Sequence, residues 1–259
     1  ILQNKNYRNH ILATNEGSAV SLAIGKYLST QKVPVVYMQN SGLGNTINPL
    51  LSLADEKVYG IPIILLIGWR GEPGVKDEPQ HIKQGEITLD LLKVMGIEYQ
   101  IIDKDTHHVS NIVKKAVDSS RNNSNPFAIV VRKGTFMKYK LPEKDQNYCW
   151  DREDAINILL DYVNDDFIVS TTGKASRELF EARESRNEGH GRDFLTVGGM
   201  GHASQIACGI SMSSNKRVWC FDGDGAALMH LGSNGISALH SNKSFVHVHL
   251  NNFAHDSVG

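Results

Sequence analysis

Short apolar segments alternate with amphipathic segments along almost the whole sequence, and this alternation limits the possible folds most strongly. In the first half, strands are predicted at 10–14, 33–39, 61–69, 98–103 and 126–132, and helices between them at 16–29, 44–58, 86–95 and 107–121. Strands that are apolar on both faces and separated by helices form parallel sheets covered on both sides. Residues 1–132 are therefore predicted to form an α/β domain with a doubly wound parallel sheet.

The same pattern starts again after residues 133–150, a polar stretch interrupted by Pro142 that is predicted to be a linker. In residues 151–259, strands are predicted at 166–171, 194–197, 217–222 and 245–251, and helices near 151, at 174–186, from about 202 and at 226–240. This half is predicted to be a second, tandem doubly wound α/β domain. Both halves are expected to be truncated. The first begins close to a strand, and the second has four predicted strands, whereas such domains usually have about five or six, so its C-terminal end is expected to be incomplete.

Composition and charge argue against several classes of protein. The formal net charge is -1 and basic runs are short, which does not favour nucleic-acid binding. The sequence has no run of about 18 apolar residues and does not begin like a signal peptide, so we expect a cytoplasmic protein that does not bind membranes.

Metal-binding signatures of the zinc type are also weak. Cys149, Cys208 and Cys220 form no CxxC spacing and are expected to be thiols in a reducing compartment. No pair of histidines has a convincing zinc-ligand spacing with a third ligand. His247 and His249 alternate along a predicted strand and are interpreted as packed strand residues.

The segment CFDGDGAALM places Asp224 between two glycines, directly after the predicted strand 217–222. The backbone amides of Gly225 and Ala226 would open a helix and could bind an anion. One helix and one strand later, Asn252 would lie beside Asp224 if the two strands are neighbours, and oxygen ligands of this kind suit Mg2+. An isolated GDG sequence could equally be a surface turn. The longer pattern, in which a helix, a strand and Asn252 follow, fits fewer structures.

This pattern of GDG, helix, strand and NN resembles the thiamine diphosphate (ThDP) and magnesium motif of ThDP-dependent enzymes. The resemblance implies that Asp224, the Asn252 side chain and the Ala254 carbonyl bind Mg2+, which anchors the diphosphate. The segment STTGKASRELF resembles a second diphosphate loop of these enzymes, with Thr172 and Gly173 near the phosphates.

Two further segments resemble parts of the same family. In TVGGMGHASQIACGIS, Met200 would hold the cofactor in its bent conformation and the Gly198 carbonyl would accept a hydrogen bond from its 4'-amino group. In LATNEGSAVSLAIG, the resemblance implies that Glu16 reaches N1' of the aminopyrimidine. Without the resemblance, Glu16 is equally a first-turn acid favoured by the helix dipole, and residues 196–211 are a glycine-rich loop, although not a dinucleotide fingerprint.

The stretches QNSGLGNTINPL, RGEPGVKDEPQH and NNFAHDSVG most closely resemble the phosphonopyruvate decarboxylases, within the ThDP-dependent 2-oxo acid decarboxylase family. The resemblance implies ThDP- and Mg2+-dependent decarboxylation of phosphonopyruvate to phosphonoacetaldehyde and CO2. It also implies a homodimer or higher homo-oligomer with the active site between two subunits. Sulfopyruvate decarboxylases are similar, so sulfopyruvate remains an alternative substrate.

Substrate-binding residues are expected in the loop after the strand at 61–69. Arg70 and Lys76 could bind the phosphonate, although they could equally be solvated loop charges. His81 and His255 could move protons or bind the phosphonate, or could be structural. A ThDP-dependent carboligase, and a non-catalytic nucleotide-binding α/β protein, remain as other hypotheses.

Overall fold

The computed structural model describes residues 10–137 and 150–252. Contacts divide the chain into two compact units, residues 1–141 and residues 142–259, and the division falls within the predicted linker. Each unit contains one parallel sheet with helices on both faces, so the prediction of two tandem α/β domains is confirmed.

The first unit holds a four-stranded parallel sheet in the order β1-β2-β4-β3. Its elements are α1 (Glu16–Thr30), β1 (Val35–Gln39), the 3-10 turn η1 (Asn40–Gly42), α2 (Leu43–Pro49), the π-helical turn η2 (Leu50–Ala54), β2 (Ile64–Gly68), α3 (Pro79–Val94), β3 (Glu98–Ile102), α4 (Val109–Asn122) and β4 (Phe127–Val131).

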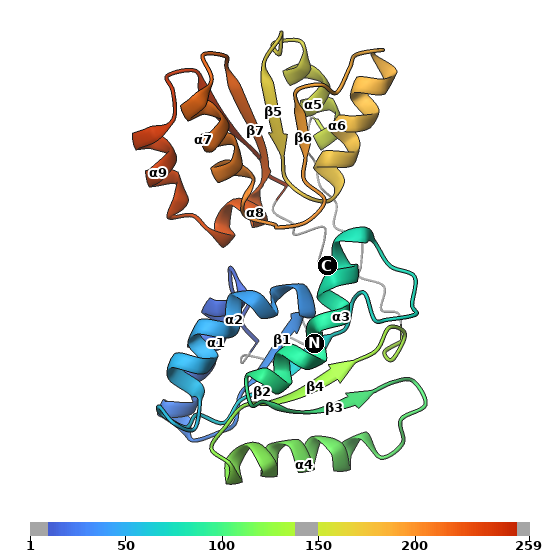
Figure 1. Cartoon of the computed structure of the whole chain (residues 1–259), viewed down its shortest axis with the longest axis vertical. Coiled ribbons are helices and arrows are strands. Elements are labelled where there is room, and N and C mark those ends of the chain that lie inside the picture. The colour runs from blue at the N-terminus through green and yellow to red at the C-terminus, as the bar shows by residue number, and fades with distance from the viewer. Residues whose placement is uncertain (1–9, 138–149, 253–259) are drawn as a thin grey trace. The chain divides into compact units, whose positions relative to one another are not determined.

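The helices of this unit cover the two faces of the sheet unequally, as Figure 1 shows. Helices α1, α2 and α3 pack on one face, where Val20, Leu65 and Leu92 are buried in the larger core cluster. Helix α4 alone covers the other face, around Ala116 and Ile129. Because every residue of β4 is buried, this strand reads as a continuous apolar run, as expected for the interior of a parallel sheet.

Three elements differ from the sequence prediction, two in the first unit and one in the second. The predicted strand at 10–14 is wrong: its described residues have no regular structure, and Ile11 and Leu12 are about two thirds exposed. The helix predicted at 86–95 begins earlier, at Pro79, because proline fits the first turn of a helix, where its missing N–H costs nothing. In the second unit, the helix predicted at 226–240 is two helices.

The second unit holds a four-stranded parallel sheet in the order β6-β5-β7-β8. Its elements are α5 (Arg152–Leu160), β5 (Phe167–Ser170), α6 (Lys174–Ser185), β6 (Asp193–Leu195), α7 (Ala203–Ser213), β7 (Val218–Gly223), α8 (Asp224–Met229), α9 (Ser233–His240) and β8 (Phe245–Leu250).

Helices α5 and α6 pack on one face of this sheet and α7 packs on the other, with α9 against α7 (Figure 1). Alternate residues of β7 therefore face different layers: Phe221 packs towards α5 and α6, whereas Cys220 packs towards α7. Helix α5 begins with a capping box between Asp151 and Asp154. Within the described ranges, no helix is both long and apolar enough to cross a membrane.

Candidate active site

The carboxyl ends of β7 and β8 lie side by side in the second unit. The two strands pair in register as far as Gly223 and Leu250, so the expectation that they are neighbours is confirmed. Asp224 therefore begins α8 next to the point where Asn251 and Asn252 leave β8. The Asp224 carboxylate accepts a hydrogen bond from the backbone N–H of Gly225 at 2.6 Å.

The topological switch point of this sheet lies between β5 and β7. From β5 the chain crosses to β6 on one side and then returns to β7 on the other, and open α/β sheets bind ligands at such a point. Thr171 follows β5 there, and its backbone N–H donates to the Phe221 carbonyl at 2.8 Å. Its hydroxyl is buried and has no hydrogen-bond partner among the residues that the structure describes. A buried hydroxyl of this kind is costly unless a ligand satisfies it.

Sequence reasoning singled out Thr172 and Gly173 but missed Thr171. The structure places all three in the turn between β5 and α6, and Gly173 has φ 97°, a conformation that favours glycine. Thr171 can be identified only from the strand order, because the position after β5 is a switch point only if β6 and β7 lie on opposite sides of β5.

The loop that carries Gly198 and Met200 is held by two histidines that sequence reasoning also missed. Nδ1 of His230 lies 3.2 Å from the Gly201 carbonyl oxygen, and the centroids of the His202 and His230 rings are 4.6 Å apart. Gly201 has φ 87°, and a Cβ atom there would lie 2.6 Å from Nδ1 of His230. The loop is thus fixed by backbone and side-chain contacts on its helix side.

In the first unit, Glu16 is the first residue of α1, and the Asn15 side chain caps this helix. The Glu16 carboxylate accepts a hydrogen bond from the Asn45 side chain at 2.8 Å. It also lies directly over Gly42, the last residue of the η1 turn that follows β1, where a Cβ atom would be 2.2 Å from Oε1 of Glu16. The carboxyl group is therefore placed by contacts from α1, η1 and α2 together.

The predicted substrate cations differ in their surroundings. Asp77 binds the Arg70 guanidinium through two hydrogen bonds, one of them 2.8 Å long, and accepts another from the backbone N–H of Gly71. The Arg70 guanidinium holds the pKa of Asp77 well below its usual value, and Asp77 in turn raises the pKa of Arg70. Lys76 is exposed and forms no ion pair within the part of the chain that is described.

His81 lies in the same loop, at the start of α3. Its Nδ1 atom is buried without a hydrogen-bond partner among the described residues, and burial lowers the pKa of this histidine, as does the Arg70 charge. The loop closes tightly, since a Cβ atom on Gly85 would lie 1.7 Å from the Gly71 carbonyl oxygen. The predicted residues Ala254 and His255 lie outside the described residues.

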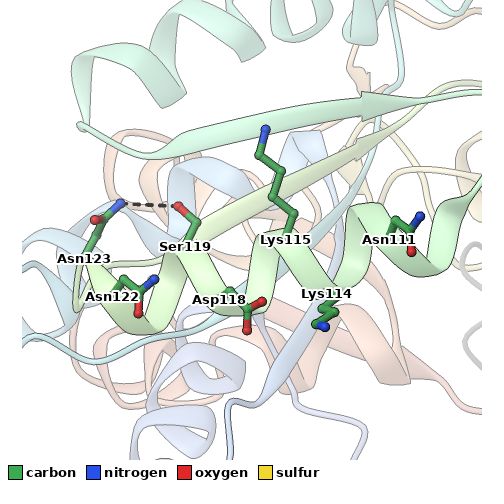
Figure 2. A pocket seen from close by; sticks show the side chains of 7 residues that line it. All are labelled: Asn111, Lys114, Lys115, Asp118, Ser119, Asn122 and Asn123. Carbon is green, nitrogen blue, oxygen red and sulfur yellow. Dashed lines mark hydrogen bonds between the residues drawn. The ribbon is translucent and has the colours of Figure 1, made fainter.

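Two of the cavities among the described residues lie in the first unit. One, of about 1060 Å³, is a groove between α1 and the α2–η2 segment, and Asn15, Gly17 and Ser18 on either side of Glu16 line it. The other, of about 500 Å³, runs along α4 alone, where Lys115 extends from one side of the helix and Lys114 and Asp118 lie on the opposite side (Figure 2). Because this furrow belongs to a single helix and none of the predicted site residues lines it, it takes no part in the candidate site.

Two family models match the sequence. The N-terminal TPP binding domain of thiamine pyrophosphate enzymes matches residues 2–94, and the C-terminal TPP binding domain of these enzymes matches residues 171–259.

Curated relatives match nearly the whole chain. A phosphonopyruvate decarboxylase of Streptomyces viridochromogenes is 32% identical over 267 residues, which cover 96% of this chain and 65% of the relative. A sulfopyruvate decarboxylase of Methanosarcina acetivorans is 28% identical over 271 residues, covering 96% of this chain and 67% of the relative. A sulfopyruvate decarboxylase subunit alpha of Methanococcus maripaludis is 38% identical over 122 residues, covering 47% of this chain and 70% of the relative. The chain thus spans 65% of the length of the Streptomyces relative.

Proposed function

The chain belongs to the thiamine pyrophosphate enzyme family, and we propose that it catalyses the ThDP- and Mg2+-dependent decarboxylation of phosphonopyruvate to phosphonoacetaldehyde and CO2. The observation that carries the proposal is the pairing of β7 with β8, whose adjoining ends bear Asp224 and Asn252. A carboxylate and an amide oxygen on neighbouring strand ends are suitable ligands for one Mg2+ ion that also binds a diphosphate.

The second unit fits the diphosphate end of the cofactor. The buried Thr171 hydroxyl at the switch point is free to donate to a phosphate oxygen. Thr172 and Gly173 lie in the same turn, and the backbone amides of Gly225 and Ala226 belong to the first turn of α8. Asp224, Asn252 and the Ala254 carbonyl would complete the set by holding Mg2+.

The loop at 198–201 would hold the aminopyrimidine side of the cofactor. The Gly198 carbonyl would accept a hydrogen bond from the 4'-amino group, and the Met200 side chain, which is partly exposed, would pack against the bend. The contacts of His230 with Gly201 hold this loop in one conformation. A loop that is already ordered loses less conformational entropy when it binds a ligand.

In the reaction, Glu16 would hold a proton between its carboxyl group and N1' of the aminopyrimidine. Oε2 of Glu16 is already hydrogen-bonded to Asn45, which orients the carboxyl group and leaves Oε1 beside Gly42. When bound, ThDP supplies the electron sink that accepts the electron pair released as CO2 leaves. The residues of this chain supply orientation and proton transfer.

The loop at 70–85 would bind the substrate. Lys76 is the more available cation, whereas Arg70 would have to share its guanidinium with Asp77. Burial lowers the pKa of His81, which favours its neutral imidazole, and Nδ1, which has no hydrogen-bond partner among the described residues, could accept or relay a proton. His255 would act from the second unit.

We assign this chemistry to a homodimer or higher homo-oligomer in the cytoplasm. The name of the Methanococcus relative describes a subunit, which supports an assembly of chains in this family. Cys208 and Cys220 are buried free thiols, which fits a reducing compartment.

The preferred substrate can be identified from steady-state kinetics with phosphonopyruvate and with sulfopyruvate, in which aldehyde release is measured in the presence of ThDP and Mg2+. We expect a higher kcat/KM for phosphonopyruvate, and loss of turnover with EDTA that Mg2+ restores. A higher kcat/KM for sulfopyruvate would move the assignment to that substrate, which the Methanosarcina relative also supports.

The role of Glu16 is tested by the variant Glu16→Gln. We expect turnover to fall by about 100-fold or more with the fold retained, because general acid–base groups contribute at least that much. Glu56→Gln, an exposed glutamate of the same unit, is the matched control and should keep full activity. Unchanged turnover in Glu16→Gln would defeat the proposed mechanism.

A further inference from the structure

Three side chains capable of binding metal meet on one face of the second sheet, below the strand ends. Cys220 and Asp222 are two residues apart on β7 and therefore share a face, and His247 of β8 is the register partner of Cys220. One sulfur, one carboxylate oxygen and one ring nitrogen of these residues lie within 4.8 Å of one another. Cys220 and Asp222 are 0% and 1% exposed, so the cluster is not an accident of a solvated surface.

We propose that Cys220, Asp222 and His247 form a binding site for one thiophilic divalent cation of the zinc class, distinct from the Mg2+ site at Asp224. Thiolate sulfur, imidazole nitrogen and carboxylate oxygen are the three ligand types that Zn2+ uses in proteins. Mg2+ prefers oxygen ligands, so the two sites would select different ions.

The distances within the cluster suit a shared ion. Nε2 of His247 lies 3.2 Å from Oδ2 of Asp222. Two ligands bonded to Zn2+ at about 2.0 Å in a tetrahedron are separated by about 3.3 Å. The ion would replace the hydrogen bond that this pair makes without metal. On the other side of the ring, Nδ1 of His247 lies 3.4 Å from Nε2 of His249, which can accept the Nδ1 proton and fix the tautomer.

A bound dication would balance the charges of this cluster. Burial raises the pKa of Cys220, and the nearby Asp222 carboxylate raises it further, so the thiol is protonated when no metal is bound. Binding of a dication would release the thiol proton to solvent and form the sulfur–metal bond. The dication, the thiolate and the carboxylate then sum to zero charge where Cys220 and Asp222 are buried and the His247 side chain is 14% exposed.

Sequence spacing concealed this site because its third ligand comes from a neighbouring strand. Only the β7–β8 register brings His247 opposite Cys220. A bound ion would tie together the two strands whose ends bear Asp224 and Asn252. Since it would bind the folded protein alone, it would also raise stability by mass action.

The test uses the whole chain, dialysed against a chelator and titrated with Co2+ in the absence of ThDP and Mg2+. We expect one equivalent of Co2+ to bind with a thiolate-to-cobalt charge-transfer band in the near ultraviolet, and Zn2+ to abolish the band by displacement. The variants Cys220→Ser and His247→Gln should lose the band. Cys208→Ser, which alters another buried thiol of the same unit, and Asp224→Asn should keep it.

A measurement on the wild-type protein can overturn the proposal even if the variants do not fold. Absence of the charge-transfer band in the wild-type protein contradicts the site, as does a band that survives Cys220→Ser. A second measurement compares melting temperatures: Zn2+ should raise that of the wild-type protein more than Mg2+ at equal concentration. An equal rise in Cys220→Ser would show that Zn2+ binds elsewhere, and would also refute the site.

Discussion

Glu16 and Gly42 form a pair in which the small residue makes room for the functional one. Glu16 lies over Gly42 so closely that a methyl group at position 42 would overlap its carboxyl group, with Cδ at 2.3 Å. Gly42 is buried in η1, whereas the end of the Glu16 side chain can move. A side chain at position 42 would therefore displace the glutamate rather than break the sheet.

We expect Gly42→Ala to reduce turnover by about 10-fold to 100-fold, because a catalytic group moved by about 1 Å loses most of its effect. The thermal midpoint should change little. Gly44→Ala is the matched control, since a Cβ atom at Gly44 meets nothing within 4 Å, and it should retain activity. Steady-state kinetics and circular dichroism on both variants make the comparison. Equal activity of the two variants would contradict the placement of Glu16.

At the scale of elements, the loop between β2 and α3 is built around one ion pair. The Asp77 side chain is 5% exposed and binds both the Arg70 guanidinium and the Gly71 backbone N–H. The Asn40 side chain connects the same loop to the end of β1, since it accepts from the Arg70 N–H at 2.9 Å and donates to the Arg70 carbonyl at 2.8 Å. The loop is thus a rigid part of the first unit.

We expect Asp77→Asn to lower the free energy of unfolding at neutral pH by about 1–3 kcal/mol, the cost of losing hydrogen bonds to a charged group. The pKa of Asp77 is depressed in the folded state, so the unfolded chain binds its proton first as the pH falls. The wild-type advantage should therefore be complete above about pH 4 and shrink as the pH falls below that value.

Urea unfolding of both proteins at neutral pH and near pH 3 measures this difference. The control is Asp90→Asn, because Asp90 is an exposed acid paired with Lys93 at 3.1 Å. Its effect should be below about 0.5 kcal/mol at either pH, as for other surface ion pairs. A difference for Asp77→Asn that stays constant across the pH range would show that the carboxylate charge is not the source of stability.

Elements with strong apolar periodicity were predictable from the sequence, and those that depend on neighbours were not. The buried strands β2, β4 and β7 follow directly from apolar runs, because central strands of a parallel sheet are covered on both faces. The run at 10–14 includes the apolar residues 11–13 but forms no strand in the described structure, and composition cannot reveal that. The predicted length of helix α3 was too short because its first turn is polar.

The same division holds for the candidate site. Asp224 and Asn252 lie in motifs contiguous in sequence, so their positions after strand ends were predictable. Glu16 was correctly predicted at a helix start, but the strand expected before it does not form. Thr171 and the cluster of Cys220 and His247 were not, because each depends on which strand lies beside which. The pairing of Arg70 with Asp77 is also a tertiary contact that no sequence pattern announces.

At the scale of the whole molecule, the proposed site is divided between the two units. Glu16 belongs to the first unit, and Asp224 and Met200 belong to the second. If the site forms between two subunits, the two halves come from different chains, which is the arrangement expected for a symmetric dimer with two equal sites. Variants that damage one half each can distinguish this from a site within one chain.

We expect Glu16→Gln and Asp224→Asn to be inactive separately and to regain activity when unfolded and refolded together. A hybrid dimer would contain one site with both defects and one site with neither. Random pairing makes half of the dimers hybrids, so the mixture should reach about a quarter of wild-type turnover. A mixture of Glu16→Gln with itself, treated identically, is the control. If the mixed sample remains inactive although size-exclusion chromatography shows dimers, each chain builds its own site and the shared-site proposal is wrong.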